Sequence, residues 1–183
     1  MNIRLATPDD APAIARVHII SWRAAYQDIM PEEKLYGLDY VRITESFRKS
    51  ISFGAEEIYL AEKNCDVLGF LAFNGAFDLD ICRGTITGIC AIYLTPENWR
   101  KGIGRMLYQA CEKTLKSRSC ATVTLWVFAD NVRARRFYEA MGFTTDGEAT
   151  VLNMGASVKA VHYRKHIGHA YEPTEQRCEI RLH

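Results

Sequence analysis

The chain has 183 residues, of which 48% are apolar and 25% charged, and this composition is typical of one globular domain and excludes a disordered or fibrous protein. Its net charge of +1 at pH 7 gives no general attraction for nucleic acid or an anionic membrane, so any polyanion must be bound by a local feature. No apolar run approaches the roughly 20 residues that span a bilayer, and the amino terminus lacks a signal-peptide pattern, so we expect a cytoplasmic protein.

The first part of the chain predicts a strand followed by two helices. A short apolar segment, 2–6, precedes Thr-Pro-Asp-Asp at 7–10, which supplies an N-cap, a proline at the first helical position and acids in the first turn. Apolar side chains at helical spacing extend this helix to about Asp28. A second helix is expected over 31–47, with Leu35, Leu38, Val41 and Phe47 as its buried positions and Gly37 as a weak point.

The middle of the chain predicts three strands. Apolar runs at 58–62 and 67–73, separated by four mostly polar residues, indicate an antiparallel hairpin. After a polar loop, the β-branched run 85–95 is expected to form the strand around which the domain is organised. It ends at Pro96 in a turn rich in positive charge and glycine, beyond which a helix runs to about Ser117.

The last part predicts another strand, a helix and a closing pair of strands. Segment 122–128 is almost continuously hydrophobic, which favours a central strand covered on both faces. Asp130 and Asn131 open a helix that ends at Gly142, and the final strands are expected at 143–151 and 157–165.

Cysteine and histidine usage gives no strong metal signal. The six cysteines form no Cys-x-x-Cys pair and most lie in apolar segments, so we expect reduced, buried thiols. His162 and His166 have the i, i+4 spacing of a helical metal pair, but this region resembles a strand and then a polar tail. We therefore expect no metal.

The turn before the fourth helix has the features of an anion site. Backbone N–H groups at a helix start lack intrahelical acceptors, and the helix dipole adds partial positive charge there. Gly102 and Gly104 would let a phosphate approach the backbone, and Arg100, Lys101 and Arg105 surround it with charge. On this stretch alone, a plain strand-to-helix turn is an equally good interpretation.

A second motif links this turn to a known family. Residues 130–143 read Asp-Asn-Val-Arg-Ala-Arg-Arg-Phe-Tyr-Glu-Ala-Met-Gly-Phe, which resembles the Asn-x-x-Ala-x-x-Phe-Tyr-x-x-x-Gly-Phe signature of the GNAT superfamily of acyl-CoA-dependent N-acetyltransferases. The Gly102-Ile103-Gly104 turn lies where that family has its Gly-x-Gly pyrophosphate loop, and the element order matches over about 2–165.

The resemblance implies an α/β fold and a division of the chain. The expected fold is a central mixed, mostly antiparallel β-sheet of about seven strands, flanked by about four helices, with a splay between the fourth and fifth strands. Residues 1–166 would form a single N-acetyltransferase domain, and 167–183 a polar tail.

The resemblance also implies roles for individual residues, with acetyl-CoA as the cosubstrate. Backbone groups would hold the pantetheine arm and the pyrophosphate, and Asn131 and Phe137 would contact the cofactor from a second wall. Tyr138 would be the general acid that protonates the departing thiolate. The cofactor-binding positions are Ile92, Tyr93, Leu94, Arg100, Lys101, Gly102, Ile103, Gly104, Arg105, Asn131 and Phe137.

Two further groups have open interpretations. Trp22, Arg23 and Tyr26 would line the acceptor pocket by analogy with the family, although aromatic residues at helical spacing are also typical of a core. Three arginines at 133, 135 and 136 are expected on a solvated helix face, with one of them in reach of the cofactor's 3′-phosphate.

The sequence departs from the family pattern at two positions. Many members have glutamine or arginine three residues before the first loop glycine, where this chain has Trp99. Many also have a glutamate early in the organising strand as general base, where this chain has Gly88. The base is therefore unassigned, and the candidates are Asp78, Asp80, Glu97, His162 and bulk water.

The expected function is acetyl transfer from acetyl-CoA to a primary amine by direct attack in a ternary complex. The alternatives are a non-catalytic acyl-CoA sensor on the same fold and an unrelated nucleotide binder. The second alternative is disfavoured because this chain lacks the Lys-Ser/Thr that follows the glycines of a P-loop. The expected partner is a small-molecule amine or a protein amino group, not nucleic acid or a membrane. The sequence does not decide the oligomeric state, and a homodimer is one possibility.

Overall fold

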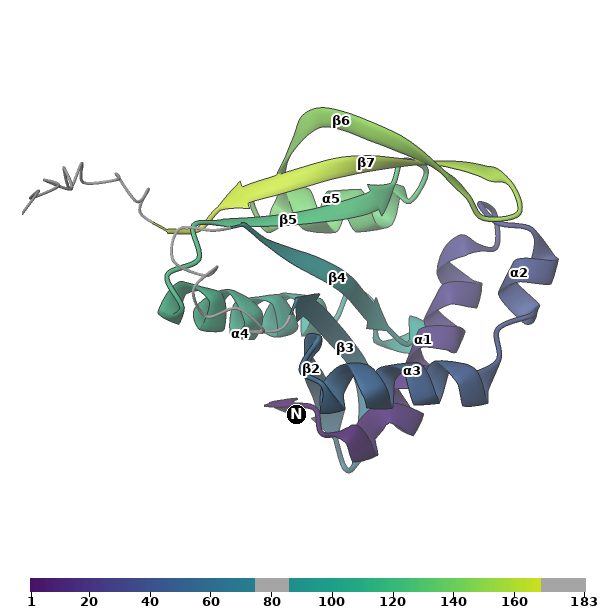
Figure 1. The fold of residues 1–183 in the computed structure, drawn as a ribbon, viewed down its shortest axis with the longest axis horizontal. Helices are drawn as coiled ribbons and strands as arrows, with labels where there is room; N and C mark the ends of the chain where they lie inside the picture. The colour runs from purple at the N-terminus through teal and green to yellow at the C-terminus, as the bar shows by residue number, and fades with distance from the viewer. Residues whose placement is uncertain (75–85, 169–183) are drawn as a thin grey trace, which may run out of the picture.

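The computed structural model describes residues 1–74 and 86–168, and it shows a seven-stranded sheet with helices on both faces (Figure 1). The strand order is β1-β2-β3-β4-β5-β7-β6, and all neighbours except β4 and β5 are antiparallel. The fold expected from the resemblance is confirmed. The strands are β1 Asn2–Leu5, β2 Glu56–Lys63, β3 Asp66–Asn74, β4 Ile86–Leu94, β5 Thr122–Phe128, β6 Thr144–Asn153 and β7 Ser157–His166.

The parallel contact between β4 and β5 is short. The two strands pair only from Ile86↔Thr122 to Gly88↔Thr124. Beyond Gly88, β4 continues for six residues to Leu94 beside β3 alone. The expected splay between the fourth and fifth strands is therefore present, and it begins at Gly88.

Five α-helices lie in the described part of the chain. They are α1 Ala11–Tyr26, α2 Glu32–Tyr36, α3 Tyr40–Ser52, α4 Ile103–Ser117 and α5 Val132–Ala140, and a 3₁₀ turn, Pro8–Asp10, leads into α1. The chain between Met30 and Ser52 thus holds two helices rather than the single one expected over 31–47.

The break between α2 and α3 has a local cause. A Cβ at Gly37 would lie 2.6 Å from the Glu33 carbonyl oxygen, so only glycine fits this tight helix end. Two residues later Asp39 starts α3 by accepting the Arg42 N–H at 3.0 Å. The new register leaves Val41 68% exposed, which contradicts its expected burial, while Leu35 is buried as expected.

Two apolar layers cover the sheet. One core cluster joins α1 with β2 and β3 through Ile14, Val17, Ile58, Leu60 and Phe70. The other joins α4 with the opposite sheet face, and its members include Leu71, Phe73, Leu107, Cys111, Leu115 and Val123. The sheet therefore separates an α1/α3 face from an α4 face, and the splay is an opening between them.

Strand β5 is internal in the sheet, but it is not covered on both faces as its hydrophobic run suggested. Val123, Leu125 and Val127 are buried against the α4 side, whereas Trp126 on the other face is 48% exposed. The apolar side chains of that second face line an open cavity instead of a core.

The described cysteines are all free. Cys111 and Cys120 are buried as expected, while Cys65 and Cys90 are exposed. Cys82 and Cys178 lie outside the described residues, as does nearly all of the tail at 167–183. Within the described ranges, no helix has the length and apolar character needed to cross a bilayer.

Candidate functional site

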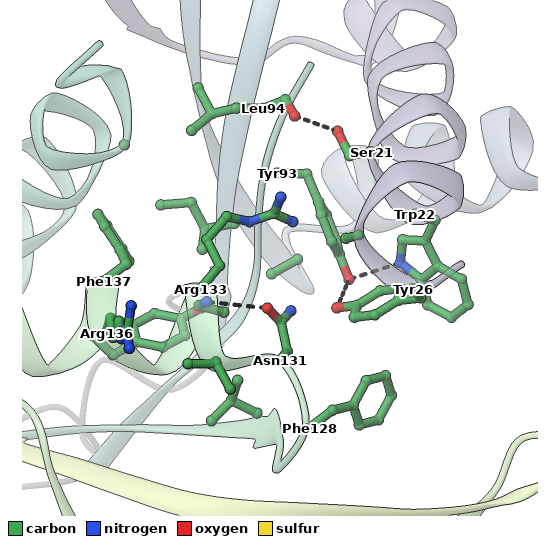
Figure 2. A pocket seen from close by; sticks show the side chains of 18 of the residues that line it. Ser21, Trp22, Tyr26, Tyr93, Leu94, Phe128, Asn131, Arg133, Arg136 and Phe137 are labelled. Atoms are coloured by element: carbon green, nitrogen blue, oxygen red, sulfur yellow. Dashed lines mark hydrogen bonds between the residues drawn. The ribbon is translucent and has the colours of Figure 1, made fainter. Parts of the chain in front are cut away.

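A cavity of about 690 Å³ occupies the splay between β4 and β5 (Figure 2). Its walls come from α1, β4, β5 and α5, with smaller contributions from β6 and β7. The three charged side chains among its lining residues are arginines: Arg100, Arg133 and Arg136. The cavity thus combines apolar and aromatic walls with positive charge at one end.

The edge of β4 offers backbone hydrogen bonds to this cavity. Thr95 donates its N–H to the Leu68 carbonyl at 3.0 Å, so alternate residues such as Tyr93 direct their backbone groups to β3. Ile92 and Leu94 then direct theirs into the splay, where β5 is no longer paired. Of the three positions expected to hold pantetheine, two present backbone groups there, and Tyr93 contributes its side chain.

One of these backbone groups is already used. The Leu94 carbonyl accepts hydrogen bonds from the Ser21 hydroxyl at 2.7 Å and from Trp99 Nε1 at 2.8 Å. The groups left for a ligand are the N–H and C=O of Ile92 and the N–H of Leu94.

The turn into α4 has the backbone geometry of an anion site. Arg100 and Gly102 both adopt left-handed conformations, with φ of 59° and 80°, and α4 begins directly afterwards. The N–H groups of Ile103, Gly104 and Arg105 therefore lie in the first turn, where they have no intrahelical acceptor. A second hollow of about 220 Å³ is lined by all of these residues and adjoins the larger cavity, whereas Lys101 lines neither.

A side chain at Gly104 would crowd its neighbours. A Cβ there would lie 3.2 Å from Phe137 Cε2 and 3.3 Å from Leu94 Cδ1. At Gly102 a Cβ would meet nothing within 4 Å, so the positive φ is what favours glycine. Phe137 thus closes the gap between α5 and the start of α4.

Trp99, which stands where many family members have glutamine or arginine, is itself in contact with an arginine. The Arg133 guanidinium of α5 lies 3.3 Å from the centre of the Trp99 ring, in cation–π contact. Both residues line the cavity, as does Arg136. Arg135 is directed away and donates to the Tyr163 hydroxyl at 3.1 Å.

Asn131 and Tyr138 carry the polar groups of the α5 wall. Asn131 caps α5 by accepting the Ala134 N–H at 3.1 Å, and it lines the cavity together with Tyr26. The Tyr138 side chain is only 6% exposed, yet its hydroxyl has no hydrogen-bond partner among the described residues. Burial first, and the nearby Tyr26 second, raise the pKa of Tyr138 well above its usual range, so it carries its proton at neutral pH.

An aromatic group forms the α1 side of the cavity. Trp22 Nε1 donates to the Tyr93 hydroxyl at 2.7 Å, and the Tyr26 hydroxyl lies 3.2 Å from that of Tyr93 (Figure 2). Arg23 does not join them. It donates to the Leu35 carbonyl at 3.2 Å and stacks on Tyr36, so it lies away from the proposed acceptor pocket.

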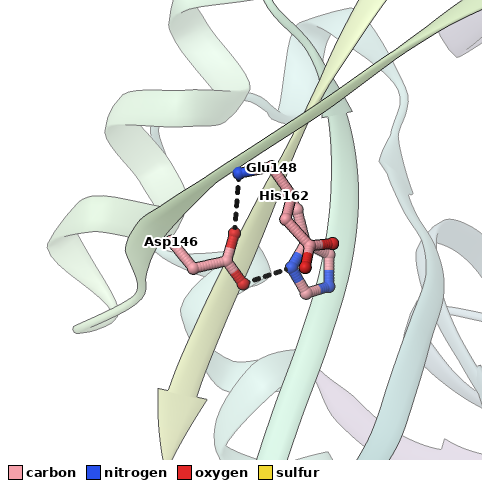
Figure 3. A group of neighbouring side chains, drawn as sticks. All are labelled: Asp146, Glu148 and His162. Atoms are coloured by element: carbon pink, nitrogen blue, oxygen red, sulfur yellow. Dashed lines mark hydrogen bonds and ion pairs between the residues drawn. The ribbon is translucent and has the colours of Figure 1, made fainter.

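A cluster of three titratable side chains, Asp146, Glu148 and His162, lies on β6 and β7 (Figure 3). His162 Nδ1 is 2.6 Å from Asp146 Oδ2, and Glu148 brings a third ligand atom within 4.8 Å of the others. The His162 ring contacts the Trp126 ring at a tilt, with the centroids 4.8 Å apart, and Trp126 lines the cavity. Three ligand atoms are one fewer than a structural zinc site uses, and two of the three residues are exposed.

The structure places some of the candidates for the general base away from the cavity. Asp78 and Asp80 lie outside the described residues. Glu97 is exposed beyond the end of β4 and does not line the cavity. His162 reaches the cavity only through Trp126. Sequence reasoning identified neither Trp126 nor the Tyr93 hydroxyl as a wall of the site, because strand alternation beside a splay is not visible in the hydrophobic pattern.

Comparison with known proteins assigns this architecture. The sequence model of the acetyltransferase (GNAT) family matches residues 19–143. A protein named probable N-acetyltransferase from Mycobacterium tuberculosis is 30% identical over 168 residues, which cover 90% of this chain and 92% of that protein. A spermidine N(1)-acetyltransferase from Thermoplasma acidophilum is 28% identical over 160 residues, covering 83% and 95%.

Solved structures show the same fold. The PaiA N-acetyltransferase of Thermoplasma acidophilum, determined in complex with coenzyme A, superposes with a TM-score of 0.71 at 20% identity. The match covers 91% of this chain and 99% of that one.

Proposed function

The chain belongs to the acetyltransferase (GNAT) family, with acetyl-CoA as its acyl donor, and from this premise we propose that it acetylates a primary amine by direct attack in a ternary complex. The observation that carries the proposal is the continuity of the site. The hollow at the start of α4 adjoins a cavity that is lined by Tyr138, whose hydroxyl has no described hydrogen-bond partner, and by the aromatic residues of α1.

The donor is proposed to bind along the β4 edge and the start of α4. Ile92 and Leu94 would hydrogen-bond the pantetheine amides as a neighbouring strand would, and the N–H groups of Ile103, Gly104 and Arg105 would hold the pyrophosphate. Arg100, Arg133 and Arg136 add positive charge at the same end of the cavity, which suits a phosphorylated ligand.

Tyr138 is proposed to protonate the departing sulfur. Tyr138 lines the cavity, its hydroxyl has no hydrogen-bond partner among the described residues, and it keeps its proton at neutral pH because burial raises its pKa. A phenol in this state can donate a proton but cannot act as a base.

Direct attack is favoured over an acetylated enzyme. Cys90 is the one thiol among the described residues lining the cavity. Desolvation and the Glu56 carboxylate raise the pKa of this thiol to about 12. The thiolate is the nucleophilic form, so Cys90 is a poor acetyl carrier at neutral pH.

Initial-rate kinetics test the direct attack. Varying acetyl-CoA at several amine concentrations should give intersecting reciprocal plots, and mass spectrometry of the intact protein with acetyl-CoA alone should show no added acetyl group. Parallel plots together with an acetylated protein would indicate a covalent intermediate and overturn the proposal.

The acceptor is proposed to be a small-molecule amine or a protein amino group, entering from the α1 side past Trp22 and Tyr26. Residues 1–166 would be sufficient for the reaction. A second candidate function, a non-catalytic acyl-CoA sensor, is favoured by one observation: none of the described lining residues is a carboxylate or a histidine.

A further inference from the structure

The described walls of the cavity lack a group to accept the amine's proton. An amine is mostly protonated at neutral pH and cannot attack a carbonyl carbon until it loses a proton. The described charged lining residues are all arginines, which only donate hydrogen bonds. Among the described residues, a proton acceptor would therefore have to lie behind the wall, within reach of a lining residue.

Glu56 lies in such a position. It is directly opposite Asn74 in the antiparallel β2–β3 pair, so the two side chains lie on the same face of the sheet. Asn74 Oδ1 accepts a hydrogen bond from the Cys90 thiol at 2.9 Å, and Cys90 lines the cavity. Asn74 thus lies between the cavity-lining Cys90 and the strand position of Glu56.

The described hydrogen bonds leave acceptor capacity on Glu56. The Glu56 charge is close enough to Cys90 to help raise the pKa of the thiol. The single thiol proton cannot serve both Asn74 and Glu56 at once. Ser50 of α3 donates to Glu56 Oε2 at 3.0 Å, which holds the carboxylate in place but uses only part of its four lone pairs.

Gly88 keeps this route open. It is the last β4 residue paired with β5, and a Cβ there would lie 3.2 Å from Asn74 Nδ2. A larger side chain at this position would displace the Asn74 amide that contacts Cys90. Gly88, which replaces the glutamate that many relatives have on this strand, therefore leaves room for the Asn74–Cys90 contact beside Glu56 of β2.

We propose that Glu56 is the proton acceptor of the reaction, reached from the amine through water beside Cys90. The inference rests on the proposed acetyl transfer. An ammonium group loses two protons as the C–N bond forms and the C–S bond breaks. One replaces the proton that Tyr138 gives to sulfur, and the other passes to Glu56 and then to solvent.

The pH dependence of kcat/KM tests this role. With 2-phenylethylamine and its less basic 2,2-difluoro analogue as acceptors, the wild-type acid limb should lie at the same pH for both, because the enzyme sets it. In Glu56→Gln, kcat/KM at pH 7 should fall about 100-fold, and the limb should move to the pKa of each amine. Glu57→Gln is the matched control, since Glu57 follows on the same strand but pairs with Arg118 at 2.6 Å on the other face.

A second readout needs no turnover. Removing the Glu56 charge should lower the pKa of Cys90, so iodoacetamide should alkylate Cys90 about 2- to 10-fold faster at pH 8.5 in Glu56→Gln, measured by peptide mass spectrometry. The Glu57→Gln variant should react at the wild-type rate. An unchanged rate in Glu56→Gln would show that Glu56 does not face Cys90 and would overturn the inference.

The outcomes separate this inference from the proposed function. If the acid limb is unchanged in Glu56→Gln but shifts in Asp78→Asn, Asp80→Asn or His162→Gln, another residue accepts the proton and the inference is wrong while acetyl transfer stands. If the wild type acetylates neither these amines nor any other in a wider panel, although acetyl-CoA binds, the proposed function fails and the inference falls with it.

Discussion

Replacing Tyr138 with phenylalanine removes the proposed general acid and little else. The ring packs against Phe137 and Phe143, with centroids 5.4 and 5.8 Å away, and phenylalanine keeps both contacts. The hydroxyl has no hydrogen-bond partner among the described residues, so the variant loses no described intramolecular bond. We therefore expect the free energy of unfolding to change by less than about 1 kcal/mol.

The expected kinetic loss is much larger. General acid catalysis contributes about 10²- to 10⁴-fold, which corresponds to about 3–5 kcal/mol of activation free energy. Burial raises the pKa of Tyr138, so the hydroxyl stays protonated through neutral pH and the loss should be present across that range. A thiol reagent should report the fall in kcat, while calorimetry should show unchanged affinity for acetyl-CoA.

Tyr108→Phe is the matched control for this experiment. Tyr108 also contacts Phe143, at 5.5 Å, but it does not line the cavity. Its variant should retain wild-type turnover. Turnover of Tyr138→Phe within twofold of wild type would reduce Tyr138 to a packing residue, and a loss of acetyl-CoA affinity instead would assign it to binding.

Two further predictions test the cofactor site and the acid stability. Gly104→Val should raise the Kd for acetyl-CoA at least about 10-fold without loss of helical circular dichroism. The valine side chain would crowd Phe137 and Leu94, which lie 3.2 and 3.3 Å from the Cβ position. Unchanged affinity in a folded variant would refute this role of Gly104. Arg4 donates a hydrogen bond to Asp10 Oδ1 at 2.7 Å, and this bond lowers the pKa of Asp10 from 3.8 to about 2. The contribution of the Asp10 carboxylate to the free energy of unfolding should therefore be complete at neutral pH and lost as the pH falls from about 4 to 2. Urea unfolding should show Asp10→Asn less stable than wild type by about 1–2 kcal/mol at pH 7, with the gap largely closed at pH 2; an equal gap at both would contradict the assignment.

Most of the fold could be predicted because its signals are local. Hydrophobic periodicity predicts the strands and helices, and the pattern around Asn131 and Gly142 predicts both ends of α5, where the structure shows a side-chain cap and a φ of 89°. The break at Gly37 was missed because the segments on either side both have helical spacing. Only the 2.6 Å approach to the Glu33 carbonyl shows that the helix ends there.

The site could be predicted only where a motif marks it. Gly102, Gly104 and Tyr138 belong to recognisable patterns. Glu56 and Cys90 are 34 positions apart in the sequence, and their proximity depends on the pairing of three strands, so no local pattern reveals it. The contact between Arg133 and Trp99 likewise forms only when α5 packs beside the turn before α4.

Acetyl transfer itself is the central claim, and an amine panel tests it most directly. Purified protein with acetyl-CoA and single amines, including 2-phenylethylamine, spermidine and a peptide with a free amino terminus, should release CoA thiol faster than the amine-free control. Mass spectrometry should show one acetylated amine for each thiol released. Thiol release no faster than in the control for every amine, in protein that binds acetyl-CoA by calorimetry, would contradict the account and identify an acyl-CoA-binding module.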